Sequence, residues 1–306
     1  MSDQSVLIVM GTYQGERFLR EQLDSLAGKT HRDWRLYASD DGSTDKTRKI
    51  VEKFATTSSN DVILIDGPRQ GCVVNFLTAI GRAPGTDYYA FCDQDDIWEP
   101  DKLERAVSIL QSVPESRSAL YCGRTRIVDE AARPIGLSPA FVRPPSFANA
   151  LVQSIGGANT MVMNSAARDL LRAAGVDDDV VSHDWWAYQL VSGSGGYVYY
   201  DLEPKVRYRQ HHSNQSGANN TLGARVKRLR LLFQGHFKTW TDRNIRALSW
   251  ARQVLTAESG AMIGALVEVR TSPIPRNVIF LSRSGLCRQT PMSTFALRVA
   301  AAFGKL

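Results

Sequence analysis

The chain has 306 residues, 43% hydrophobic and 22% charged, which is the composition of an ordinary globular protein with one large core and an appendage. Its four cysteines (Cys72, Cys92, Cys122 and Cys287) show no paired spacing, which argues against a zinc site or a disulfide framework. No apolar stretch reaches the roughly 18 residues of a membrane span, and the first residues lack a signal pattern, so we expect a cytoplasmic protein.

Charge is unevenly distributed along the chain. Residues 1–204 contain 20 Lys and Arg against 28 Asp and Glu, whereas residues 205–306 contain 17 against 3, so the balances of −8 and +14 sum to the net charge of +6. A basic C-terminal part predicts an anionic partner, either lipid headgroups or nucleic acid. No nucleic-acid-binding motif accompanies the charge, which favours a membrane surface.

Short apolar runs alternate with helical patterns in the first hundred residues. The expected strands are Val6–Met10, Trp34–Ser39, Val62–Ile65 and Tyr88–Cys92. The expected helices contain Phe18–Leu26 (ended by Gly28), Ile50–Phe54 (capped by Ser43 or Thr44) and Val73–Ile80. This alternation predicts an α/β fold with a mostly parallel central sheet flanked by helices.

The pattern continues to about residue 210 and then changes. The expected elements are a helix at 100–110, strands at Ser118–Cys122, Thr125–Val128 and Asn159–Met163, helices at Ala166–Ala174 and Trp185–Val191, and the last strands of the sheet at Tyr197–Tyr200 and Val206–Tyr208. We therefore expect one domain over residues 1–217 and a basic, mainly helical extension over 218–306.

The extension begins with a basic amphipathic pattern. Apolar residues from Leu222 to Trp240 recur at steps of three and four between arginines and lysines, and a second helical run covers Ile245–Leu255. Pro273 and Pro275 mark a break, and Phe295–Phe303 is expected as a last helix. Segment 222–256 is predicted either to lie on an anionic membrane, or to pack on the first domain or on a second subunit.

Four acidic clusters stand out, namely Asp40–Asp45, Asp93–Asp96, His183–Trp186 and Asp201–Pro204. The first two follow expected strands, and in an open parallel sheet ligands bind beyond the carboxyl ends of the strands. Asp40 or Asp41 is suited to a nucleobase N–H or to ribose hydroxyls, while Thr12 and Tyr13 end the neighbouring strand, where a ring can stack on a base. The alternative is a simple strand-to-helix turn.

Three carboxylates within four residues repel one another unless a cation offsets them. Asp93 and Asp95 alternate in an extended segment and so lie on the same side, suited to holding one metal together with diphosphate oxygens. The hard oxygen ligands predict Mg²⁺ or Mn²⁺. A solvated acidic loop is the alternative.

Two further segments carry candidate site residues. Asp184 could act as a general base, with Trp185 and Trp186 walling a sugar pocket; the alternatives are a helix cap and buried packing. The loop Arg207–Gly217 contains His211 and His212, of which at most one should face the site, to engage a diphosphate or a metal. A basic surface loop is the alternative there.

Taken together, the segments 6–15, 39–45, 92–98, 183–186 and 208–217 resemble the family-2 inverting glycosyltransferases, and most of all the rhamnosyltransferase-like enzymes of bacterial surface-polysaccharide assembly. The resemblance implies a glycosyltransferase A-type fold, a nucleoside-diphosphate sugar donor carrying thymine or uracil (dTDP or UDP), and a divalent metal. It covers residues 5–217, which would form the catalytic domain.

By position, the resemblance implies a role for each candidate. Thr12, Tyr13, Asp40 and Asp41 would bind the nucleoside, Asp93 the ribose, Asp95 and His211 the metal, and Asp184 would be the base. Two positions depart from the pattern. Arg69 stands where relatives often have Asn, which puts its nucleotide contact in question, and His183 stands where many have Glu, which points to a role in the acceptor or sugar pocket.

The implied reaction is transfer of a sugar, with inversion, to a hydroxyl of a saccharide or lipid-linked saccharide in surface-polysaccharide or O-antigen synthesis. We expect His183, a nearby arginine or the metal to offset carboxylate repulsion at Asp184. The alternatives are a family member transferring GlcNAc, galactose or glucose, a sugar-nucleotide pyrophosphorylase, and a non-catalytic nucleotide-sugar-binding protein. A pyrophosphorylase needs a glycine-rich basic loop that Thr12–Arg17 does not supply.

Overall fold

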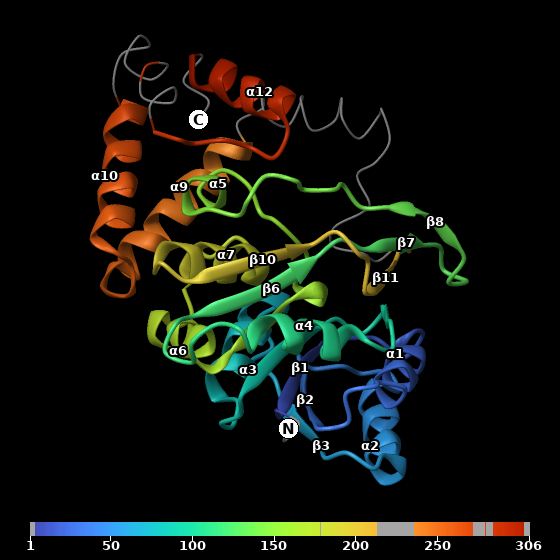
Figure 1. The fold of residues 1–306 in the computed structure, drawn as a ribbon. Helices are drawn as coiled ribbons and strands as arrows, with labels where there is room; N and C mark the ends of the chain where they lie inside the picture. The colour runs from blue at the N-terminus through green and yellow to red at the C-terminus, as the bar shows by residue number, and fades with distance from the viewer. Residues whose placement is uncertain (1–3, 178, 213–235, 272–278, 280–283, 303–306) are drawn as a thin grey trace.

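A computed structural model describes residues 4–177, 179–212, 236–271, 279 and 284–302. A seven-stranded sheet in the order β10-β6-β9-β4-β1-β2-β3 forms its centre (Figure 1). The strands are β1 (Val6–Thr12), β2 (Trp34–Asp40), β3 (Val62–Asp66), β4 (Tyr88–Cys92), β6 (Ala119–Gly123), β9 (Val162–Asn164) and β10 (Tyr197–Asp201). Every pairing is parallel except the two made by β9.

The central strands are apolar throughout because both faces of the sheet are covered. Successive side chains of β1 enter different cores: Val6, Ile8 and Met10 pack on one face, and Leu7 and Val9 on the other. This double burial confirms the expectation of a parallel sheet with helices on both sides.

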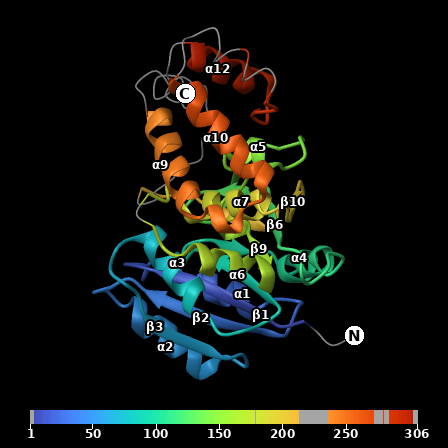
Figure 2. The same cartoon turned by 90° about the vertical axis from the view of Figure 1, so that its left-hand side faces the viewer.

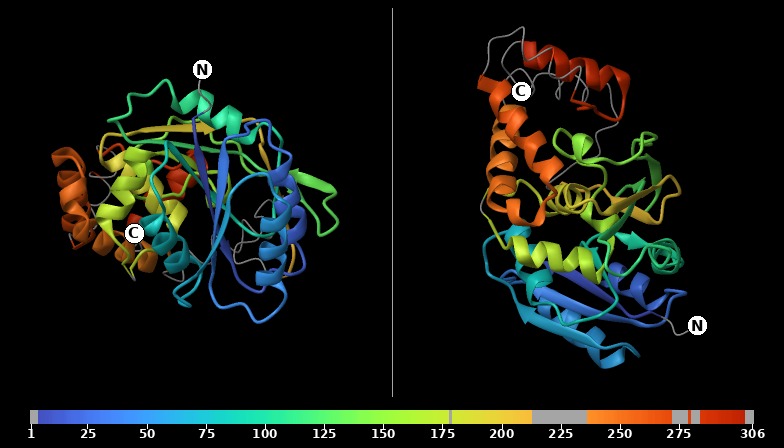
Figure 3. Two further views of the ribbon diagram at one scale, coloured as in Figure 1. Left: turned by 90° about the horizontal axis from the view of Figure 1, so that it is seen from below. Right: turned by 60° about the vertical axis from the view of Figure 1, so that its left-hand side comes forward.

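Helices α1 (Leu19–Ala27), α2 (Thr47–Thr57) and α4 (Lys102–Leu110) cover the first face. The opposite face is covered by α3 (Cys72–Arg82), α6 (Ser165–Ala174) and α7 (His183–Gly193), together with the short α5 (Phe147–Ala150). Figures 2 and 3 show the sheet between the two layers. Each expected helix of the first 200 residues is therefore present, within a few residues of its expected bounds.

A second, four-stranded sheet corrects one prediction. It has the order β5-β11-β7-β8, formed by β5 (Ile97–Trp98), β7 (Arg126–Val128), β8 (Pro134–Leu137) and β11 (Val206–Arg209). We expected Val206–Tyr208 in the main sheet. It pairs instead with β5, which directly follows the Asp93–Asp96 loop, so the chain after β11 is led to that loop.

The expected strand Asn159–Met163 is also different. Ala158–Thr160 forms a 3-10 turn, η1, and strand β9 begins only at Val162. The Thr160 hydroxyl and amide both donate to the Gly157 carbonyl, which closes the turn. The polar residues Asn159 and Thr160 fall in the turn, and the apolar residues Val162 and Met163 fall in the strand.

Helices α9 (His236–Trp250), α10 (Ala257–Thr271) and α12 (Pro291–Ala302) follow, with the 3-10 turn η2 (Arg252–Val254) between the first two. The expected boundary at 217/218, the basic segment 222–235, Pro273, Pro275 and Phe303 lie outside the described residues. Ile245 and Leu248 of α9 are buried in the same core as α7. The described part of segment 222–256 thus packs on the first domain, which was one of the predicted alternatives.

In the part of the chain that the structure describes, no helix is both long and apolar enough to cross a membrane.

Candidate active site

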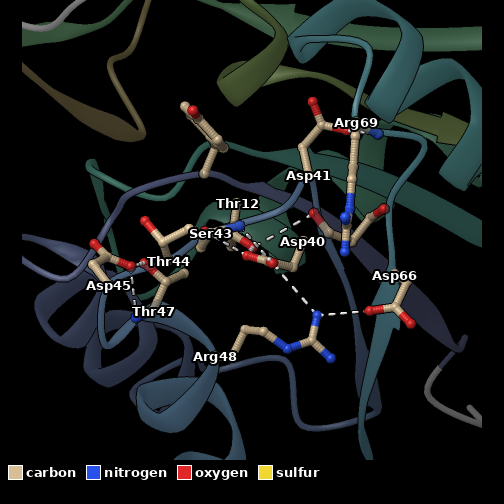
Figure 4. A network of polar contacts seen from close by, with 12 residues as sticks. Thr12, Asp40, Asp41, Ser43, Thr44, Asp45, Thr47, Arg48, Asp66 and Arg69 are labelled. Carbon is tan, nitrogen blue, oxygen red and sulfur yellow. Dashed lines mark hydrogen bonds and ion pairs between the residues drawn. The ribbon is translucent and has the colours of Figure 1, made fainter.

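The ends of β1 and β2 form the first part of the site. Thr12 and Asp40 are register partners, and the Thr12 hydroxyl donates to Asp40 Oδ1 at 3.0 Å. The Asp40 carboxylate also accepts the Ser43 hydroxyl at 2.6 Å and the Ser43 amide at 3.0 Å, and Arg48 approaches it at 3.4 Å (Figure 4). Asp40 is thus buried and engaged within the protein, where it holds the turn after β2.

Helix α2 begins under a different cap from the one expected. Neither Ser43 nor Thr44 caps it: the N-cap is Lys46, which makes no side-chain capping hydrogen bond, and Oδ1 of Asp45, one residue earlier, accepts both the Thr47 amide at 2.9 Å and the Thr47 hydroxyl. A carboxylate is favoured at this position because the helix dipole is positive at its N-terminus. Ser43 lies before the helix, and its hydroxyl and amide donate to Asp40 instead.

Asp41 links the turn after β2 to the turn after β3. Its two oxygens accept the backbone amides of Arg69 at 2.6 Å and Gly71 at 2.7 Å. Both residues have positive φ, 61° at Arg69 and 90° at Gly71, and the Arg69 side chain lies over Gly42, within 3.2 Å of where a Cβ would be. Arg69 therefore lies beside Asp41 and Gly42, at the edge where the nucleoside was predicted.

The loop after β4 meets the chain after β11. His211 Nε2 lies 2.8 Å from Asp95 Oδ2, and the His211 ring packs against Phe18 with centroids 4.8 Å apart. His212, in contrast, is exposed. The structure thus brings one of the two histidines to the acidic loop, as expected.

Two buried residues that the sequence did not single out, Arg209 and Asp96, fix the position of this loop. The guanidinium of Arg209 is fully buried and donates to the Asp95 carbonyl at 3.0 Å, to the Glu130 carbonyl and to the Glu21 carboxylate. Asp96 is fully buried and accepts the Arg209 amide at 3.1 Å and the Asn159 side chain. Asp96 belongs to the acidic cluster Asp93–Asp96 and Arg209 to the loop Arg207–Gly217, but only the fold shows that both residues are buried.

Several of the candidate carboxylates act electrostatically on the same buried groups. Burial, with the neighbouring charges of Asp95 and Asp184, raises the pKa of Asp93 to about 7. Burial likewise raises the pKa of the Cys72 thiol, at the start of α3, to about 12. The carboxylates that add to the Cys72 shift are, from the largest effect down, Asp93, Asp184, Asp41 and Asp95. Carboxylates from three separate acidic clusters of the sequence thus contribute to raising the pKa of the same thiol.

Such a group of like charges fits a bound cation, which would relieve the repulsion. Among the described residues, no three His, Cys, Asp or Glu side chains are arranged to hold a metal by themselves. The pair Asp95 and His211 supplies one nitrogen and one carboxylate oxygen, and the carboxylate is the kind of donor that Mg²⁺ and Mn²⁺ take. Ions of this kind in nucleotide enzymes take their other ligands from phosphates and water, so a two-residue protein contribution is sufficient.

Asp184 lies partly exposed in the first turn of α7, the position at which acidic residues are common in helices. Its Oδ1 accepts the Trp185 amide at 2.6 Å. Asp184 is thus a partly exposed carboxylate whose charge acts on Asp93.

His183 does not supply the positive charge expected beside Asp184. It is buried against Phe76, with the rings stacked at 4.2 Å and 15°, and against Phe91. Neither ring nitrogen has a hydrogen-bond partner among the described residues. Burial lowers the pKa of His183 to about 4, so the ring is neutral near pH 7 and cannot offset carboxylate repulsion. Its burial also argues against a direct pocket contact.

The two tryptophans agree with the packing alternative. Trp185 is 6% exposed and donates its indole N–H to the Ala150 carbonyl, and Trp186 is 1% exposed. Both belong to the core beneath α7. They position the helix that carries Asp184 and do not line an open pocket.

The fourth acidic cluster is structural. Asp201, at the end of β10, accepts from Arg105 at 2.9 Å and from the Tyr121 hydroxyl at 3.1 Å. Glu203 pairs with Lys205 at 2.7 Å. Asp201 thus ties β10 to α4 and β6, while Glu203 pairs within its own loop.

Known proteins of the same architecture identify the family. Residues 7–162, about half of the chain, match the family described as Glycosyl transferase family 2. The matched residues include the acidic loops after β2 and after β4. The chain belongs to this family. It is therefore a glycosyltransferase, and Asp41, Asp93 and Asp95 of the site described above lie within the matched residues.

Relatives and solved structures agree with this assignment. The chain is 29% identical over 238 residues to the dTDP-rhamnosyl transferase RfbG of Shigella flexneri, covering 73% of this chain and 78% of that protein. It is 34% identical over 110 residues to the UDP-Glc:alpha-D-GlcNAc-diphosphoundecaprenol beta-1,3-glucosyltransferase WfgD of Escherichia coli, which covers 36% of this chain and 42% of that one.

Among solved structures, the crystal structure of S. aureus TarS 1–349 in complex with UDP-GlcNAc has a TM-score of 0.53 at 16% identity, covering 97% of this chain and 90% of that one. The mannosyltransferase PcManGT from Pyrobaculum calidifontis, in complex with GDP-Man and Mn²⁺, has a TM-score of 0.50 at 18% identity, with coverages of 99% and 86%. These likenesses confirm the glycosyltransferase A-type fold, with its C-terminal helices.

Proposed function

We propose that this glycosyltransferase moves a sugar from a dTDP- or UDP-linked donor to a hydroxyl of a saccharide or lipid-linked saccharide during surface-polysaccharide synthesis. The observation that carries the proposal is the convergence of Asp41, Asp93, Asp95 and Asp184 near Cys72, with His211 on Asp95. Rhamnose is the proposed sugar, supported by the name of the RfbG relative, and the lipid-linked acceptor by that of WfgD.

In this proposal the nucleoside lies over the ends of β1 and β2. Tyr13, which is 56% exposed, is free to stack on the base, and Asp41 and Arg69 lie at the same edge. Thr12 and Asp40 support this surface through their mutual hydrogen bond. Asp93 is assigned to the ribose and diphosphate side of the donor.

Asp95 and His211 would hold Mn²⁺ or Mg²⁺, which when bound would stabilise the negative charge of the departing nucleoside diphosphate. The other step is assigned to Asp184. It removes the proton of the acceptor hydroxyl while the new bond to the anomeric carbon forms and the bond to the phosphate oxygen breaks. General-base assistance of this kind contributes about 10²–10⁴-fold in rate.

We also propose that the basic C-terminal part holds the enzyme at an anionic membrane, near a lipid-linked acceptor. The apolar side of α9 is used in the core, while Trp240 and Trp250 on the same helix are 44% and 71% exposed. Exposed tryptophans with neighbouring cations suit a headgroup region. Salt-sensitive pelleting with anionic but not neutral liposomes is expected, and salt-independent dimerisation without pelleting would support the subunit alternative instead.

The function is tested by mixing the protein and Mn²⁺ with dTDP-rhamnose, UDP-glucose, UDP-galactose or UDP-GlcNAc and a lipid-linked acceptor. Release of nucleoside diphosphate that depends on the acceptor and stops on chelation is expected with one donor. Binding of a donor without turnover under all these conditions would favour a non-catalytic nucleotide-sugar-binding protein.

A further inference from the structure

Gln94 lies between Asp93 and Asp95 in the sequence, and its side chain contacts the backbone of Tyr13. Its side-chain oxygen accepts the Tyr13 amide at 2.9 Å, and its side-chain nitrogen donates to the Tyr13 carbonyl at 2.8 Å. One amide side chain thus satisfies both backbone polar groups of the residue after β1. The two loops come from adjacent strands, since β1 pairs with β4 along their length.

Gly15 leaves room for this contact. A Cβ on Gly15 would lie 2.2 Å from Gln94 Oε1 and 2.6 Å from Gln94 Cδ, and the three nearest atoms to it all belong to Gln94. Gly15 is buried, with its amide donating to the Thr47 hydroxyl at 2.7 Å and its carbonyl accepting from Phe18 and Leu19. The backbone at this point is therefore held on both sides, and any larger residue would displace Gln94.

We propose that Gln94 is a positioning residue that couples the nucleoside loop (Thr12–Gly15) to the metal loop (Asp93–Asp96). The inference rests on the proposed function, because it assigns the two loops to the two ends of one donor. Tyr13 is held by Gln94, and Gln94 lies between the two carboxylates that the proposed function assigns to the metal and the diphosphate. Ordering either loop therefore orders the other, so each end of the donor favours binding of the other.

The chemistry requires an amide at this position. An isosteric carboxylate still accepts the Tyr13 amide but places an oxygen against the Tyr13 carbonyl, with no proton between them. A methionine preserves the length and volume and loses both hydrogen bonds. Comparison of Gln94→Glu, Gln94→Met and Gln94→Ala thus separates hydrogen bonding from packing.

The test measures binding of UDP and dTDP with Mn²⁺ by calorimetry. All three variants are expected to bind the preferred nucleotide about ten-fold more weakly than wild type, the loss typical of one or two partly exposed hydrogen bonds. Their melting temperatures should stay near that of wild type. Gln111→Ala, at the exposed C-terminal end of α4, is the control and should bind as wild type does.

A double-mutant cycle adds an outcome that a general loss of structure would not produce. Gly15→Ala alone should weaken binding because it displaces Gln94. In the Gly15→Ala/Gln94→Ala protein the clash is absent, so binding should be no weaker than in Gln94→Ala. Additive losses, or wild-type binding by Gln94→Ala and Gln94→Met, would overturn the inference. Failure of wild type itself to bind either nucleotide would instead overturn the proposed function, and this inference with it.

Discussion

His211 Nε2 and Asp95 Oδ2 lie 2.8 Å apart although 116 positions separate them in the sequence. The contact is made because β11 pairs with β5, the short strand that follows the acidic loop. It joins the chain after β11 to the loop after β4, at the edge of the main sheet where the parallel strands end. The pair is the part of the site that depends most on the second sheet.

Replacing His211 by alanine should raise the Mn²⁺ concentration needed for half-maximal activity by at least about ten-fold, the loss typical even of an outer-shell partner. His212→Ala is the matched control, because the neighbouring ring is exposed. Activity would be titrated with Mn²⁺ in both proteins. An equal change in the two variants would argue against a metal role for His211.

Asp184→Asn should reduce transfer by about 10²–10⁴-fold, since the amide cannot accept the acceptor's proton. The substitution is nearly isosteric at a partly exposed position, so nucleoside-diphosphate binding should stay within about three-fold of wild type. Glu115→Gln, an exposed carboxylate away from the site, is the control. Steady-state rates and calorimetric binding would be measured side by side, and unimpaired turnover by Asp184→Asn would remove it as the base.

Removing Arg209 should loosen the metal loop as well as the fold. Arg209→Met leaves the Asp95 and Glu130 carbonyls and the Glu21 carboxylate without their shared donor. Leaving a buried backbone carbonyl without its donor typically costs about 1–3 kcal/mol, whereas the Glu21 carboxylate, 55% exposed, can be solvated by water. Urea unfolding would measure that loss, and a Mn²⁺ titration of the folded variant should show weaker metal activation. Unchanged stability would mean that the network contributes little.

The buried Lys102 predicts a particular pH dependence of stability. Its ammonium lies 3.3 Å from the centre of the Trp98 ring, and burial lowers its pKa to about 7 from an ordinary value of 10.5. Between these values the unfolded chain keeps a proton that the folded protein has lost. The free energy of unfolding contributed by this group therefore rises with pH from about 7 to about 10.

Lys102→Met should abolish that rise while preserving the volume, and should increase stability near pH 6, where wild type must bury a charge. Denaturant unfolding of wild type and variant at several pH values from 6 to 9.5 tests this. The difference between the two proteins should shrink as pH increases. A difference that is constant with pH would contradict the assignment.

Several features followed from local pattern. Continuous apolar runs such as Val6–Met10 predict buried parallel strands, because such strands are covered on both faces. Asp41, Asp93 and Tyr13 come directly after strand ends, and the carboxyl ends of parallel strands meet at one edge. The order of these motifs along the chain therefore determined the fold class, the family and the edge at which the site lies.

Other features were decided only when distant segments came together. Hydrophobicity alone did not place β11 in the second sheet, and the motif alone did not show that His183 is buried and neutral. The same holds for Trp185, Trp186, Asp96 and Arg209, whose burial depends on neighbours up to 188 positions away. The protonation state and role of each such group depend on its desolvation and its partners, and these are properties of tertiary packing.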